Sequence, residues 1–79
     1  MGVLDDIADK LAVDALAAAE EFGDEGLVDE LAKVLEASST FAFESYMSSI
    51  RARVALTRAR TRLTAKIAAA QKAKDAPPT

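Results

Sequence analysis

The sequence predicts an all-α protein, a helical hairpin or three-helix unit with one long C-terminal amphipathic helix that oligomerises as a coiled-coil-like helical bundle. Three observations support this. Apolar residues recur at three- and four-residue steps, Gly and Pro occur only at positions 2, 23, 26, 77 and 78, and the last periodic segment contains a seven-residue repeat. We therefore expect a single domain over residues 1–75 and a disordered tail at 76–79, where Pro cannot continue a helix.

The first helix is expected over residues 4–22. Its acidic residues fall largely off one apolar stripe, as an amphipathic helix requires. The stripe consists of Leu4, Ile7, Leu11, Ala15, Ala18 and Phe22. Asp5 and Asp6 in the first turn suit the positive end of the helix dipole. Gly23 is expected to end the helix as a C-terminal cap.

The second helix is expected over residues 25–38, with Asp24 as its cap. One face of this helix is apolar and consists of Leu27, Leu31, Val34 and Leu35. Ser38, Ser39 and Thr40 then interrupt the pattern, because their hydroxyls compete for backbone hydrogen bonds and favour a cap. Thr40 is the predicted N-terminal cap of the third helix.

The third helix is expected over residues 41–74, a length of about 50 Å at the α-helical rise. This segment has no Gly or Pro and is dense in good helix formers. Within it, the heptapeptide beginning at Arg51 is nearly repeated by the one beginning at Arg58. A repeat of seven keeps one seam of a helix against a packed neighbour, as in a coiled coil.

Two apolar stripes lie on nearly opposite faces of the third helix at about 100° per residue. One contains Phe43, Met47, Ile50 and Val54, and the other contains Leu56, Leu63, Ile67 and Ala70. The first two helices are about 28 and 21 Å long, so the third should extend more than about 20 Å beyond a hairpin of both. Its distal apolar residues then need either the first helix docked on the far half or a second chain, and we favour a second chain.

Association is also the expected source of stability. A chain of 79 residues buries only about 60% of its unfolded surface, and this one has no Cys for disulfides. The charges are divided, because residues 1–44 carry a net charge of −10 and residues 45–79 carry +7. We expect a homo-oligomer, with a dimer favoured over higher orders, and a protein partner is also possible. The predicted interface residues are Leu56, Leu63, Ile67, Ala70, Arg53 and Arg60, with both arginines pairing to acids of the first two helices.

Catalysis is not expected. The chain has neither His nor Cys, which removes the usual general base, the thiolate nucleophile and the common soft metal ligands. Carboxylates one turn apart, such as Asp5 and Asp9, are interpreted as a solvated acidic face. No catalytic residue, metal ligand or cofactor is therefore assigned. The predicted function is a small interaction module that acts as an adaptor, assembly factor or regulator.

The alternative function is binding of a phosphate-bearing ligand, either nucleic acid or a nucleotide. Four arginines on the third helix are the candidate anion-binding residues, because a guanidinium matches phosphate geometry. They are Arg51, Arg58, Arg60 and Arg62. The acidic half of the chain opposes polyanions, and no aromatic residue follows Arg51 for a base to stack on.

Four bulky residues at the start of the third helix, Phe41, Phe43, Tyr46 and Met47, are expected to fill the core. The first residues lack the basic start and apolar core of a signal peptide, and no apolar run reaches membrane-spanning length. We therefore expect a cytoplasmic protein without a membrane partner.

Overall fold

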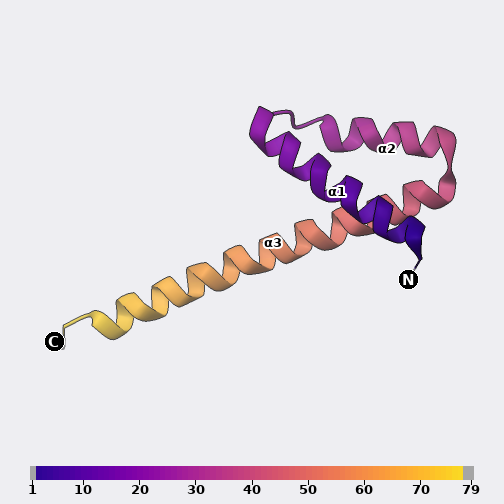
Figure 1. Ribbon diagram of the computed structural model, residues 1–79. Helices are drawn as coiled ribbons and strands as arrows, with labels where there is room; N and C mark the ends of the chain where they lie inside the picture. The colour runs from indigo at the N-terminus through magenta and orange to yellow at the C-terminus, as the bar shows by residue number, and fades with distance from the viewer. Residues whose placement is uncertain (1, 78–79) are drawn as a thin grey trace.

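The computed structural model describes residues 2–77 and contains three helices, α1 (Val3–Phe22), α2 (Leu27–Ser38) and α3 (Thr40–Asp75). The described residues contain no strand, so the predicted all-helical class is confirmed. α1 crosses the first part of α3, α2 returns beside them, and α3 then continues alone (Figure 1). Met1 and the last two residues of the expected tail lie outside the described range.

The predicted C-terminal cap of α1 is present. Gly23 has a φ of 65°, in the left-handed region that favours glycine, and its amide donates to the Glu20 carbonyl at 3.4 Å. The next amide, of Asp24, donates to the Ala19 carbonyl at 2.9 Å. These bonds satisfy carbonyls at the end of α1 and reverse the chain toward α2.

Two predicted N-terminal caps require correction. Asp24 does not cap α2: its Oδ1 accepts from the Gly26 amide at 3.2 Å and closes a turn, so α2 begins at Leu27, two residues later than expected. At α3 the capping side chain belongs to Ser39, whose Oγ accepts from the Ala42 amide at 3.2 Å. Ser39 has an extended backbone that suits a cap, whereas Thr40 is already helical.

The core is built largely from small residues where the helices meet. The buried residues are Ala8, Ala12 and Ala15 of α1, Ala32 of α2, and Tyr46 and Ile50 of α3. Alanines let the backbones approach closely enough for the one large buried ring, Tyr46, to fill the remaining space. Its hydroxyl donates to the Val28 carbonyl of α2 at 2.9 Å, so the buried polar atom is satisfied.

The predicted apolar faces of the first two helices are partly wrong. Ile7 and Phe22 on α1 are 60% and 75% exposed, and Val34 on α2 is 59% exposed. The buried face of α1 instead follows its alanines, because close packing of crossing helices selects small side chains at the contact. The stripe predicted on the first half of α3 does pack against the core, with Ile50 buried and Phe43, Met47 and Val54 partly buried.

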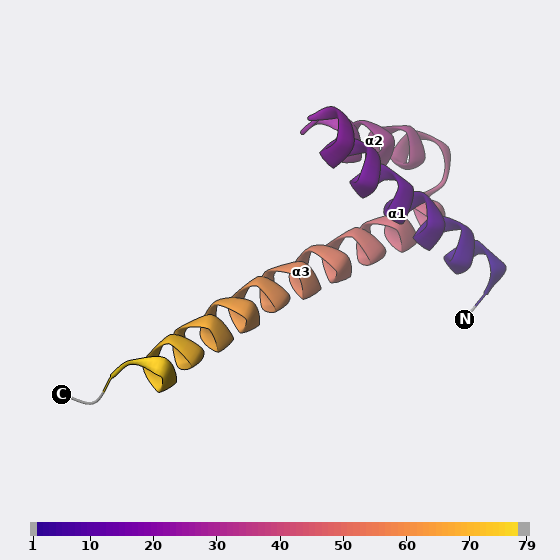
Figure 2. The same cartoon turned by 60° about the vertical axis from the view of Figure 1, so that its left-hand side comes forward.

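The molecule is elongated because half of α3 has no neighbour (Figure 2). Its Cα radius of gyration is 18.0 Å, whereas a compact domain of this length has about 12 Å. Residues 55–75 of α3 are all exposed, and we call this segment the rod. The remainder, formed by α1, α2 and residues 40–54 of α3, is called the head.

None of the helices in residues 2–77 combines the length and the apolar character needed to cross a membrane.

Candidate association surface

Four predicted interface residues form a line of exposed apolar side chains on the rod, and we call this line the rod stripe. It consists of Leu56, Leu63, Ile67 and Ala70. Leu56 is 69% exposed, Leu63 is 48% exposed and Ile67 is 52% exposed. The alternative in which the first helix docks on the far half of the third is wrong, because α1 crosses the first part of α3 and α3 then continues alone (Figure 1). The C-terminal half of α1 reaches only the first turns of the rod, where Leu16 and Glu20 line a shallow pocket with Thr57 and Arg58. The rod stripe therefore has no cover from its own chain.

The rod is a helix whose local sequence supports it but does not fully stabilise it. It is rich in Ala and Arg, it lacks Gly and Pro, and Lys72 and Lys74 in its last turn suit the negative helix end. The rod is also continuous with the packed first part of α3, but most helical stability in proteins comes from packing one face, which the rod lacks within its own chain. A partner on the rod stripe would supply that packing.

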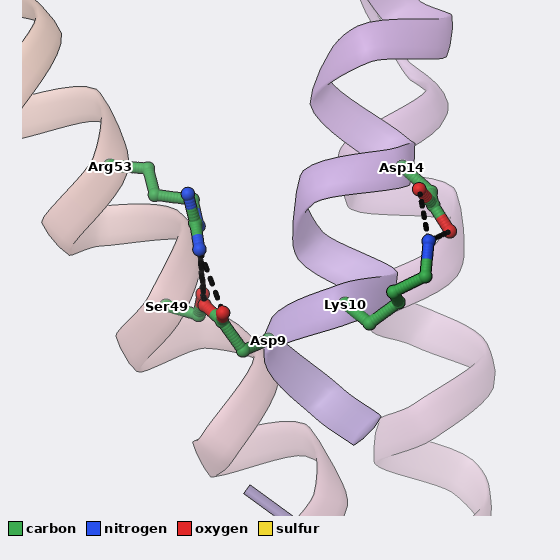
Figure 3. Close-up of polar contacts among 5 residues, drawn as sticks. All are labelled: Asp9, Lys10, Asp14, Ser49 and Arg53. Carbon is green, nitrogen blue, oxygen red and sulfur yellow. Dashed lines mark hydrogen bonds and ion pairs between the residues drawn. The ribbon is translucent and has the colours of Figure 1, made fainter. Parts of the chain in front are cut away.

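Arg53 joins α3 to α1 near the point where α3 leaves the head. Its Nη2 lies 2.7 Å from Asp9 Oδ2 and 2.8 Å from Asp9 Oδ1, and its Nε lies 3.2 Å from Oδ1 (Figure 3). The Ser49 hydroxyl also donates to Asp9. The Arg53 hydrogen bonds, followed by the one from Ser49, lower the pKa of Asp9. Arg53 thus pairs with an acid of the first helix within the chain.

The other predicted arginines have a different environment. Arg51, Arg58, Arg60 and Arg62 are exposed, and none of them forms an ion pair with another residue between 2 and 77. The expected pairing of Arg60 with acids of the first two helices does not occur within one chain, because the rod carries Arg60 away from both. These arginines remain available to a partner or an anion.

The sequence did not predict a shallow groove between the N-terminal half of α1 and the start of α3, which we call the acidic groove. Its lining includes four acids, three serines and two exposed apolar residues. They are Asp5, Asp6, Asp9, Glu44, Ser45, Ser48, Ser49, Phe41 and Leu56, with Ala52 and Arg53 completing it. The bulky residues expected to fill the core are therefore divided, because Phe41 is 63% exposed in this groove while Tyr46 is buried.

Serines of α3 hold the carboxylates of α1 in the acidic groove. Ser45 Oγ donates to Asp5 Oδ1 at 2.7 Å, and the Gly2 amide donates to Asp5 Oδ2 at 3.4 Å. The hydrogen bond from Ser45 and then that from Gly2 lower the pKa of Asp5. The four-residue spacing of Asp5 and Asp9 matches that of Ser45 and Ser49, so both acids meet a serine of α3. The matching spacings are visible in the sequence, but periodicity does not indicate that these two helix faces meet.

The groove concentrates negative charge without assembling a metal cage. Within residues 2–77, no group of three or more Asp or Glu side chains is placed to hold a metal ion. The groove therefore offers fixed carboxylates, hydroxyls and two apolar side chains, which suits a basic amphipathic partner.

Comparison with known proteins adds no relative. No protein-family model matches the sequence, and neither the curated proteins nor the solved structures contain a match.

Proposed function

We propose that this protein is a homo-oligomerising interaction module, an adaptor, assembly factor or regulator, that associates through α3, with a dimer as the favoured state. The observation that carries the proposal is the rod stripe, in which Leu56, Leu63 and Ile67 are between 48% and 69% exposed along one face of a helix without neighbours. Several large apolar residues aligned on one face mark an interaction site more strongly than scattered ones do.

The surface area of the chain supports the same proposal. A compact protein of 8.3 kDa exposes about 4,600 Å². This chain exposes 6,290 Å², an excess of about 1,700 Å² per copy. A stable interface of standard size buries about 800 Å² from each partner, so the excess is sufficient for one.

Replacing two residues of the rod stripe tests this proposal. Leu63→Asp with Ile67→Asp places two charges on the stripe, and light scattering should then report the mass of a single chain. The head should remain folded, because its buried residues all lie between Ala8 and Ile50. A matched control, Thr61→Asp with Ala68→Asp, adds the same charge on the opposite face of the rod and should leave the oligomer intact. If the mass of the Leu63→Asp, Ile67→Asp variant is unchanged, the rod stripe is not the association surface.

A second candidate function is binding of a phosphate-bearing ligand through Arg51, Arg58, Arg60 and Arg62. It is favoured by the exposure of these arginines and by their lack of acidic partners in the part of the chain that the structure describes. Titration with short DNA, short RNA and nucleotides at two salt concentrations tests it, since phosphate binding weakens steeply as salt rises. No binding at low salt would eliminate this candidate.

A further inference from the structure

We infer that two copies associate antiparallel, with the rod of each copy lying in the acidic groove of the other. This inference rests on the proposed function and names both the partner, a second copy of this chain, and its orientation. Three observations support it: the groove and the rod stripe are continuous, their lengths match, and their charges are opposite.

Continuity follows from Leu56, which belongs to both surfaces. It lines the acidic groove together with Phe41, and it is also the first residue of the rod stripe. Phe41, Ser48, Ala52 and Leu63 lie within about 60° of one another around α3, so the groove floor and the rod stripe form one face of the same helix. A partner that covers the stripe can therefore continue into the groove.

The lengths of the two parts match across Leu56. The groove floor from Phe41 to Leu56 spans about 22 Å of helix, and the rod stripe from Leu56 to Ala70 spans about 21 Å. In a twofold-symmetric dimer that places one part on the other, the shared residue must lie at the axis. With Leu56 at the axis, a residue of one copy faces the residue of the other copy that lies equally far beyond Leu56, so the numbers of facing residues sum to about 112. Ser48 of one copy therefore lies close to Leu63 of the other.

The charges favour this orientation. The head, over residues 2–54, carries a net charge of −8, and the rod carries +5. In a parallel dimer the two rods would lie side by side and repel each other, whereas in the antiparallel dimer each rod lies on an acidic head.

The charges on the two flanks of the α3 face also favour the antiparallel orientation. When two helices pair antiparallel about a twofold axis, each flank of one helix lies beside the same flank of the other. Glu44 and Arg62 are eighteen residues apart and lie on one flank. Ser49, which holds Asp9, and Arg60 are eleven residues apart and lie on the other. Each rod flank thus brings arginine to a groove wall that carries carboxylates.

Cysteine cross-linking tests the orientation, since the chain has no Cys of its own. We would prepare Ser48→Cys and Leu63→Cys separately, measure the mass of each variant by light scattering, and treat each one and their mixture with a short bis-maleimide. Ser48 is exposed and Cys is close to it in size. In the inferred dimer, each thiol lies more than about 20 Å from its own copy in the partner.

The inferred arrangement predicts dimers of both variants, covalent dimer in the mixture, and little covalent dimer from either variant alone. Covalent dimer from Leu63→Cys alone would overturn it, because Leu63 then faces itself, as in a parallel dimer or in rods paired only with each other. That result would leave the proposed oligomerisation intact. Dimers that give no covalent product in the mixture would also overturn the orientation alone, whereas single chains for the unmodified protein would overturn both.

Discussion

Arg53 and Asp9 form a two-pronged ion pair that connects residues 44 apart in the sequence, with the closest contact, Nη2 to Oδ2, at 2.7 Å. The pair lies beside the last part of α3 that packs on the head, and beyond Val54 every residue of α3 up to Asp75 is exposed. It therefore fixes the direction in which the rod leaves the head. The acidic wall of the groove depends on the same carboxylate.

Asp9→Asn tests this contact through the pH dependence of stability. Because the folded state lowers the pKa of Asp9, the contact contributes stability above the unfolded pKa of about 3.9 and loses it as pH falls through the folded value. Asp9→Asn should lower the unfolding midpoint at pH 7, and the difference from the unmodified protein should shrink on acidification. Asp14→Asn removes the same charge from an exposed pair with Lys10 within α1 and should have the smaller effect. Equal midpoints for all three proteins at pH 7 would contradict a structural role for the contact.

Tyr46→Phe should destabilise the head by about 1 kcal/mol, because the Val28 carbonyl loses its hydrogen-bond donor. Burial, and secondarily the charge of Asp29, raises the pKa of Tyr46. The stability associated with the neutral phenol is therefore full below the unfolded pKa of about 10 and is lost as pH rises through the folded value. Thermal unfolding followed by circular dichroism should show an alkaline loss of stability that is reduced in the Phe variant. An identical alkaline profile would show that Tyr46 is not the group responsible.

Ala12→Leu tests the close approach of α1 to the other helices. Ala12 is fully buried, so three additional carbon atoms should cost about 1–3 kcal/mol through overpacking. Ala17→Leu is the matched control on the exposed side of α1, where both residues are good helix formers and little change is expected. If both variants unfold at the same denaturant concentration, α1 does not pack through its alanine face.

The two glycines between α1 and α2 should respond oppositely to alanine. Gly23 has a φ of 65°, so Gly23→Ala should cost about 1–2 kcal/mol even though nothing lies within 4 Å of the added carbon. Gly26 has a φ of −89°, and its added carbon would lie 3.8 Å from Asp24 Oδ1, an ordinary contact. Gly26→Ala should therefore be neutral or stabilising by up to about 1 kcal/mol. Denaturant unfolding of both variants measures the difference, and a loss for Gly26→Ala as large as that for Gly23→Ala would contradict the turn geometry.

Periodicity was sufficient to predict three helices and the extension of the third beyond the others. The Gly23 cap followed from residue type, because only glycine adopts a left-handed backbone freely. The exposure of Leu63 and Ile67 followed from comparing helix lengths. Each of these features depends on local sequence or on the fixed rise of a helix. None of them requires knowledge of how the helices cross.

The rotation of α1 and the acidic groove could not be predicted from these rules. Large residues such as Ile7 and Phe22 suggested a face that the structure leaves exposed, because close crossing favours the smaller side chains of Ala8 and Ala12. The groove depends on α1 lying across α3 so that Asp5 and Ser45 meet, a contact between residues 40 apart. Periodicity within one helix contains no information about that distance.

Sedimentation equilibrium of the unmodified protein, over a range of concentrations at low and moderate salt, measures its mass in solution and tests the association proposal most directly. We expect a mass of twice 8.3 kDa at micromolar concentrations, with weaker association at higher salt because opposite charges meet at the interface. A mass of 8.3 kDa at every concentration, for a chain that circular dichroism shows to be fully helical through the rod, would contradict it.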